Sequence, residues 1–205
     1  MNRSNLFIIL GLIAVISLTI YTMRGGETTA DYQDFIVKER KDKDEFMKSG
    51  DESPFRKDTI PFQGLKYFPV NEKYTIKAKL EPIEKKKVVI LGTSDGQEQK
   101  YLEYAYAIFD LEDVENKLLI LELMDMGPQR GKLFLAFADA SSGIETYGAG
   151  RYLDVKKVPA ASSIELDFNL AYNPYCAYTE NFTCPFPPKE NILKVAILAG
   201  EKSYH

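Results

Sequence analysis

The chain has 205 residues, of which 45% are apolar and 27% charged, a composition typical of one folded domain with a short appendage. Only two of the 26 Lys and Arg residues precede Glu27, the first acidic residue, so residues 27 to 205 carry 24 basic and 30 acidic side chains, a net charge of −6. Because phosphate binding requires an excess of Lys and Arg, this balance argues against a nucleic-acid partner. The basic run Lys85-Lys86-Lys87 lies between acidic and strand-like residues and is interpreted as a solvated turn.

The first 25 residues contain one long apolar run. From Leu6 to Ile20 it is interrupted only by one Gly, one Ser and one Thr. Extended to Met23 the run gives about 27 Å of helix, close to the ~30 Å of a hydrocarbon layer. Residues 5–23 are therefore predicted to hold the chain in a bacterial inner membrane as a single transmembrane helix.

A cleavable signal peptide is the alternative for the same segment. Asn2-Arg3 would supply its charged start, but the stretch from Tyr21 to Gly26 contains no small-x-small cleavage motif, and no Cys follows closely to receive a lipid. An uncleaved anchor is preferred. Arg3 and the α-amino group precede the run and only Arg24 follows it closely, which places the N-terminus in the cytoplasm and the domain in the periplasm. A cleaved signal would instead leave a soluble periplasmic domain.

Residues 26–50 are predicted to form a spacer and an amphipathic helix. Apolar residues recur at helical spacing between Asp31 and Lys48. The charge run of mixed sign from Lys38 to Glu45 indicates the solvated face of a helix that lies against the domain. Gly50 is expected to end the helix.

Residues 51–205 are predicted to form one β-rich globular domain, because Pro and Gly divide this part of the chain into short segments. The turn Ser94-Asp95-Gly96 indicates a hairpin. Leu193 to Ala199 is predicted as a last strand, with a short helix after Pro187-Pro188 as the alternative. No helical crossover follows the strands, so we expect a mainly β fold with an antiparallel sheet, sandwich or partly open barrel. The other predicted strands are Tyr74–Leu80, Lys87–Leu91, Tyr101–Leu111, Lys117–Met124, Lys132–Ala138, Tyr152–Val155 and Ser163–Phe168.

A glycine-rich loop ends at Arg151. Gly148-Ala149-Gly150 permits positive φ or the close approach of another backbone, and the planar guanidinium suits a carboxylate or a phosphate. One interpretation is an anion-binding loop. The preferred interpretation is structural, with Arg151 paired to Asp139, Glu145 or Asp167 and fixing the loop to the sheet.

A second cluster, from Asp167 to Tyr178, combines amides, phenols and a thiol. Cys176 and Cys184 most simply form a disulfide in an exported domain, with reduced thiols and a metal site as the alternatives. The one histidine is the terminal His205, so a usual zinc set cannot be assembled. We predict no metal and no cofactor.

Several long motifs, in order along the chain, resemble the domain of unknown function 1684 family. The resemblance covers residues 31 to 204. It implies a bacterial protein, and it supplies no activity and no catalytic residue. The motifs are Gly64–Val70, Glu145–Tyr152, Asn173–Tyr178, Cys184-Pro185, Pro188–Asn191 and Ala199–Lys202.

Two functional classes remain. The preferred one is a binding or structural module whose glycine-rich loop and Arg, Tyr and Asn side chains recognise a small anionic ligand, a glycan or a partner protein. The residues expected to contact the ligand are Asp139, Glu145, Tyr147, Arg151, Tyr152, Asn169, Tyr172 and Asn173.

The alternative is a carboxylate-dependent hydrolase or transferase. In it Asp139, Glu145 or Asp167 would be the general base and Arg151 would stabilise negative charge. Against an enzyme, no His is placed to act as a base and no Ser lies in a Gly-x-Ser-x-Gly turn. Arg151→Ala separates a functional from a structural arginine: loss of ligand binding or turnover at unchanged stability indicates the first, and loss of stability indicates the second.

Overall fold

The computed structural model describes residues 29–56, 61–124 and 129–205. The chain divides into two compact units, Met1–Phe35 and Ile36–His205. The predicted membrane or signal segment, residues 5–23, lies outside the described residues. In the part of the chain that is described, no helix has both the length and the apolar character needed to cross a membrane.

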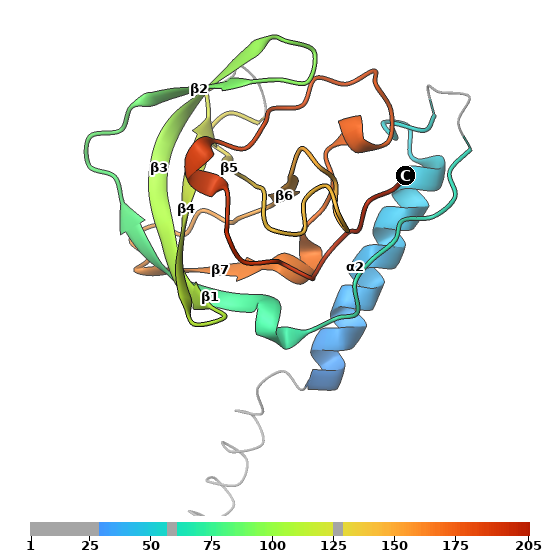
Figure 1. The fold of residues 1–205 in the computed structure, drawn as a ribbon, viewed down its shortest axis with the longest axis horizontal. Helices are drawn as coiled ribbons and strands as arrows, with labels where there is room; N and C mark the ends of the chain where they lie inside the picture. Colours follow the sequence, from blue (N-terminus) through green and yellow to red (C-terminus); the bar gives the residue numbers. More distant parts are fainter. Residues whose placement is uncertain (1–28, 57–60, 125–128) are drawn as a thin grey trace, which may run out of the picture. The chain divides into compact units, whose positions relative to one another are not determined.

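Helix α2 spans Thr29–Ser49, as the spacing of the apolar residues predicts (Figure 1). Ile36 and Met47 are its buried residues, and the charged run between them is largely solvated. Arg40 attaches the helix to the domain, since its guanidinium donates hydrogen bonds to the carbonyl oxygens of Phe68 and Asn169, at 2.8 and 3.1 Å. The predicted contact between this helix and the domain is confirmed.

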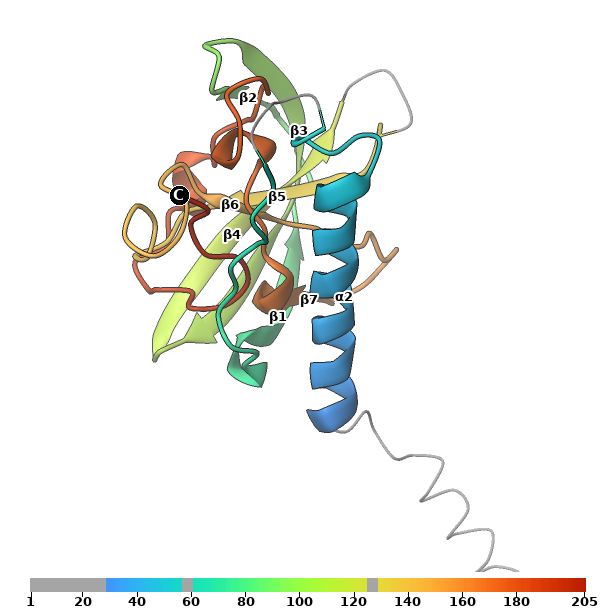
Figure 2. The ribbon, with the colours of Figure 1, turned by 90° about the vertical axis from the view of Figure 1, so that its right-hand side faces the viewer.

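The domain is built on an antiparallel sheet that curls into an open half-barrel (Figures 1 and 2). Along the sheet the strand order is β6-β5-β4-β3-β1-β7, and β2 pairs with β3 outside this path. The mainly β, antiparallel fold is confirmed, and each of the seven predicted strands before Leu193 is present. The strands are β1 (Thr75–Pro82), β2 (Val88–Gly92), β3 (Glu98–Leu111), β4 (Val114–Leu123), β5 (Leu133–Phe137), β6 (Arg151–Leu153) and β7 (Ser163–Asp167).

Strand β3 is long enough to pair with two strands along one edge. β2 pairs with its first residues and β1 with its later ones. An irregularity in the pairing with β4, between Glu103 and Ala105, changes which face each side chain occupies. Tyr101 therefore joins a small cluster with Leu91 and Tyr106, whereas the alternate residues from Ala105 to Leu111 face the main core.

Among its described residues the domain also has four short 3₁₀ helices: η1 (Glu72–Tyr74), η2 (Phe168–Leu170), η3 (Tyr175–Ala177) and η4 (Lys189–Asn191). The last predicted strand, Leu193–Ala199, is wrong, because the segment is irregular; of the helix considered as the alternative, only the 3₁₀ helix η4 is present, directly after Pro188. Its alternation does report burial, since Leu193, Val195, Ile197 and Ala199 lie in the main core. Its backbone forms hydrogen bonds with the chain after β5 only at Leu193 and Val195, and the carbonyl groups of Ile197 and Ala199 accept hydrogen bonds from an arginine side chain.

Candidate functional site

The arginine that binds the C-terminal segment is Arg151, the first residue of β6. Its side chain is fully buried. Its Nη2 lies 2.9 Å from Asp139 Oδ2 and 2.8 Å from the carbonyl oxygen of Ile197. Its Nη1 donates to the carbonyl oxygens of Ala199 and Glu201, at 2.5 and 3.1 Å. Burial lowers the pKa of this guanidinium, and the Asp139 carboxylate opposes that shift. Both terminal nitrogens of the guanidinium are thus engaged within the protein.

The sequence predicts three possible acidic partners for Arg151, and the structure pairs it with Asp139. Its other oxygen, Oδ1, accepts hydrogen bonds from the backbone N–H and the hydroxyl group of Ser141, at 2.8 and 2.5 Å. Gly150 has a φ of +90°, and a Cβ atom there would lie 2.6 Å from the Phe137 carbonyl oxygen. The glycine allows the loop to approach β5 closely, as the sequence predicts, and it brings Arg151 over Asp139.

The two predicted asparagines are buried in different places. Asn169 exchanges two hydrogen bonds with the backbone of Asn71, both of 2.9 Å. Asn173 lies beside Glu201 and donates its backbone N–H to Glu201 Oε2, at 3.0 Å. The two asparagines therefore have separate buried partners within the protein.

Glu201 is at the centre of a polar cluster that the sequence did not single out. Its side chain is 1% exposed, and its Oε1 lies 2.6 Å from the ammonium group of Lys43 on helix α2. The Tyr178 hydroxyl group donates to Oε2, at 2.5 Å. Burial, followed by the charge of Glu201, raises the pKa of Tyr178, so the phenol stays protonated as a donor. The cluster fastens the helix to the C-terminal segment of the domain.

Besides Arg151 and Asp139, the fold brings together a second pair of candidate residues, Tyr152 and Tyr172. Two backbone hydrogen bonds, of 2.8 and 2.9 Å, join them, and their rings meet edge to face at 6.0 Å. Tyr152 also packs against Phe134, with ring centroids 5.0 Å apart. The Tyr172 hydroxyl group donates to Asp154 Oδ1, at 2.8 Å. The two remaining candidates differ, since Glu145 is exposed and Tyr147 is partly buried.

Phe134 and Asp154 line an open groove of about 650 Å³ between the end of β4, the start of β5 and the segment after β6. Its apolar wall is made by Leu133, Phe134 and Val155. None of the eight candidate residues lines it, but Tyr152 and Tyr172 support two residues that do. The sequence signal that could have indicated the groove is the pair Lys156-Lys157 immediately after a strand.

Basic side chains surround this groove. Lys132, Lys156 and Lys157 line it, against one carboxylate, that of Asp154. Lys157 lies 3.1 Å from Glu122 outside the groove lining. For Lys132 and Lys156 no acidic group lies within ion-pair distance among the described residues. The groove therefore carries a local excess of positive charge in a domain that is acidic as a whole.

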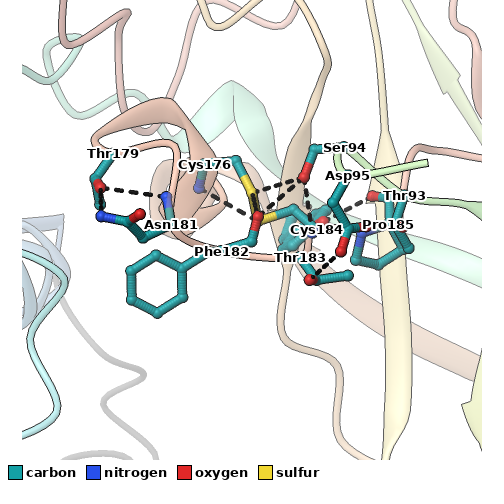
Figure 3. Close-up of a disulfide and its surroundings, with 11 residues drawn as sticks. Thr93, Ser94, Asp95, Cys176, Thr179, Asn181, Phe182, Thr183, Cys184 and Pro185 are labelled. Atoms are coloured by element: carbon teal, nitrogen blue, oxygen red, sulfur yellow. Dashed lines mark hydrogen bonds between the residues drawn. A yellow bond between two sulfur atoms is a disulfide. The ribbon is translucent and has the colours of Figure 1, made fainter. Parts of the chain in front are cut away.

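The two cysteines lie at disulfide distance, with their Cα atoms 6.2 Å apart (Figure 3). The bond closes a loop against the β2–β3 hairpin, because Ser94 Oγ donates to the Phe182 carbonyl oxygen and accepts from the Cys184 N–H, both at 3.1 Å. Asp95 joins the same contact, since its carboxylate accepts hydrogen bonds from the hydroxyl groups of Thr93 and Thr183. These two bonds lower the pKa of Asp95.

The three carboxylates considered as catalytic bases have different surroundings. Asp139 is ion-paired with Arg151, and Asp167 accepts a hydrogen bond from the Asn169 N–H at 3.0 Å. Glu145 is exposed in its loop. No observation favours the hydrolase or transferase, which stays a prediction. Within the described ranges, no three His, Cys, Asp or Glu side chains are grouped so that they could hold a metal ion.

Comparison with known proteins gives the family. The model of the family described as protein of unknown function (DUF1684) matches residues 61–202. The chain belongs to this family. It is also similar to an uncharacterized protein of Haloarcula marismortui solved by solution NMR, at 34% identity and a TM-score of 0.63, over 86% of this chain and 98% of that one. The search of curated proteins found no match.

In this member of the DUF1684 family, the motifs that carry the resemblance supply internal polar contacts. Arg151, Asn173 and Glu201 belong to three of them and form the contacts described above. A fourth contains Asn191, which the sequence did not single out. Its side-chain amide accepts a hydrogen bond from the Leu119 N–H at 2.6 Å and donates to the carbonyl oxygens of Leu119 and Ala136, at 2.9 and 2.7 Å. Asn191 therefore bridges β4 and β5 next to the point where their own pairing ends, at Leu121 and Phe134.

Proposed function

We propose that this domain is a binding module for small organic anions and that the lysine-lined groove is its binding site. The observation that carries the proposal is the position of Lys132 and Lys156, which line the groove without an acidic partner among the described residues. An anion there would form charge-assisted hydrogen bonds with both ammonium groups. The groove volume, about 650 Å³, lies in the range of small-molecule sites.

The lining also limits the kind of anion. Phe134, Leu133 and Val155 offer an apolar wall next to the lysines. A ligand with an apolar body and a carboxylate, sulfonate or phosphate at one end matches both parts of the lining. A small, fully hydrated anion would leave the apolar wall uncovered.

Under this proposal the glycine-rich loop has a supporting role. The Arg151 terminal nitrogens are bound to Asp139 and to three carbonyl oxygens, so they are not available to a ligand. Tyr152 instead packs behind Phe134, and Tyr172 holds Asp154. These contacts fix the groove wall.

We test the proposal with the fluorescent anion 1-anilinonaphthalene-8-sulfonate, which has an apolar body and a single negative charge. The double variant Lys132→Gln/Lys156→Gln is expected to bind the dye about tenfold more weakly than the wild-type chain. The matched control is Lys77→Gln/Lys194→Gln, which removes the same charge at exposed positions outside the groove lining. Equal affinity of the two double variants would contradict the proposal.

We also propose that the domain works outside the cytoplasm, held at the inner membrane by residues 5–23. The apolar run and the position of Arg3 support this topology. A fusion of alkaline phosphatase after His205 is expected to be active, because this enzyme folds only after export. Carbonate washing then separates the alternatives: an uncleaved anchor keeps the fusion in the membrane pellet, and a cleaved signal releases it.

A further inference from the structure

Strand β2 pairs with β3 along one edge, and no other named strand of the described residues pairs with its opposite edge. The Glu103 N–H donates to the Lys87 carbonyl oxygen at 2.9 Å, and the Thr93 N–H donates to the Gln97 carbonyl oxygen at 3.0 Å. Both contacts lie on the side of β3, and backbone groups alternate sides along an antiparallel strand. The N–H and C=O groups of Val88 and Ile90 therefore point away from β3.

Of the described residues, those from Cys184 to Phe186 cover one end of this edge. Thr93 pairs with Pro185 in an antiparallel bridge, and the Phe186 N–H donates to the Gly92 carbonyl oxygen at 2.9 Å. In the same register the residue opposite Ile90 is Pro188, which has no N–H to donate. The pairing stops there and the chain continues into η4, so the edge from Val88 to Ile90 has no neighbouring strand within the described residues.

The side chains on this stretch also suit an added strand. Val88 and Ile90 are 50% and 53% exposed, which is unusual for β-branched apolar residues on an edge. Leu91 points to the opposite face of the sheet and is buried with Tyr101. This packing holds β2 in place. An added strand would therefore cover apolar surface and satisfy backbone groups at once.

The charged residues at the two ends of β2 indicate how a partner strand would be oriented and which charge it would carry. Lys85 and Lys87, just before the strand, are exposed and have no ion-pair partner in the described part of the chain. Lys86 lies 3.7 Å from Glu122 and is therefore not counted among the lysines that could bind a partner. Glu98 lies at the opposite end, across from Gly92. A strand that continues the antiparallel direction of Cys184–Phe186 would bring its C-terminal end to the two lysines.

We propose that the β2 edge binds an extended peptide in antiparallel orientation, with apolar residues at alternating positions and acidic residues at its C-terminal end. The peptide would contribute hydrogen bonds to the outward groups of Val88 and Ile90 and side chains to their exposed apolar surface. Its carboxylates would pair with Lys85 and Lys87. This site is separate from the lysine-lined groove, because the two share no residue.

The test uses fluorescence anisotropy with the full chain and two labelled hexapeptides. Both alternate Thr and Val, and one ends with two Asp residues whereas the other begins with them. We expect the first to bind about tenfold more tightly. Lys85→Gln/Lys87→Gln is expected to remove this difference, and Lys77→Gln/Lys194→Gln to retain it.

Ile90→Pro tests the backbone contact. It removes one outward N–H and leaves the ladder with β3 intact, because proline is tolerated on an edge strand where the N–H faces solvent. Binding of the first peptide should weaken about tenfold, whereas Ile90→Thr, which keeps the N–H, should weaken it less. If Ile90→Pro does not fold, the binding of the two hexapeptides to the wild-type chain and to Lys85→Gln/Lys87→Gln tests the proposal.

Two results would overturn the proposal. The first is equal binding of both hexapeptides to the wild-type chain. The second is a wild-type dimer in sedimentation that the Ile90→Pro variant abolishes, because a second copy of the chain would then occupy the edge.

Discussion

Arg151 and Asp139 form an ion pair in which Nη2 and Oδ2 are 2.9 Å apart and both side chains are 0% exposed. The pair joins β6 to the segment after β5, and the same guanidinium binds the backbone of the C-terminal segment. Removing one partner of such a pair leaves the other charge buried without compensation, which costs more than the net contribution of the intact pair.

We expect Arg151→Ala to destabilise the domain by about 3–5 kcal/mol, because Asp139 and three carbonyl groups lose their donor. Urea unfolding measures the change, and the thermal midpoint should fall by roughly 10 °C. Arg151→Lys should be intermediate, since one ammonium group cannot reach all four acceptors. An Arg151→Ala variant of wild-type stability that fails to bind its ligand would restore the functional interpretation of this arginine.

Glu201 should be as important for the attachment of helix α2. Glu201→Gln is expected to cost about 2–4 kcal/mol, because Lys43 loses its buried partner. Amide exchange in residues 36–49 should accelerate. Lys41→Gln is the control, since its contact with Glu45, at 3.9 Å, is exposed and should contribute little. In a double-mutant cycle with Lys43→Met, purely additive effects would show that the Lys43–Glu201 pair is not coupled.

Asn191 offers a test of the internal polar contacts that bridge β4 and β5. Asn191→Ala leaves one N–H and two carbonyl groups of β4 and β5 without a partner, so we expect a loss of about 3–5 kcal/mol in urea unfolding. Lys189→Ala, in the same 3₁₀ helix, removes an exposed side chain and should change stability by less than ~0.5 kcal/mol. Similar values for both variants would mean that the contacts of Asn191 do not stabilise the sheet.

These residues show where sequence reasoning succeeds and where it ends. The helix and the seven strands follow from local periodicity, which each segment carries in itself. Asp139 is among the predicted partners of Arg151, but the three carbonyl groups that Arg151 also binds lie 46 to 50 residues away in the C-terminal segment, and no spacing indicates them. For the same reason Leu193–Ala199 was predicted as a strand: alternation records which side chains are buried, and it does not record which group binds the backbone.

Asn191, Glu201 and Lys43 illustrate the same limit at single positions. Each is a polar residue of a common type, and only its burial beside a distant partner gives it a role. The groove is a comparable case. Lys132 and Lys156 are 24 positions apart in the sequence and come together because β5 and β6 are neighbours in the sheet.

The Cys176–Cys184 disulfide should stabilise the loop against the β2–β3 hairpin. Closing a loop of this length corresponds to roughly 2–3 kcal/mol in the chain-entropy model. Dithiothreitol is therefore expected to lower the urea midpoint of the wild-type chain. Cys176→Ser/Cys184→Ser should start from the lower midpoint and show no response to the reductant. A wild-type midpoint that dithiothreitol leaves unchanged would contradict the stabilising role.

Alkaline pH should unfold the domain cooperatively, because burial raises the pKa of Tyr67, Tyr152, Tyr172 and Tyr178. In the unfolded chain these phenols titrate near ~10, so the folded state holds their protons more tightly. This contribution to stability is complete below about pH 10 and is lost as the pH rises above that value.

Absorbance at 295 nm follows the ionisation of the 13 tyrosines. We expect the four tyrosines named above, whose pKa values burial raises, to ionise together with the loss of circular dichroism. Tyr178→Phe should make the dependence of unfolding free energy on pH shallower above ~10, since one raised pKa is removed. If every tyrosine titrates gradually while the circular dichroism is unchanged, the buried phenols are accessible in the folded state and the prediction is wrong.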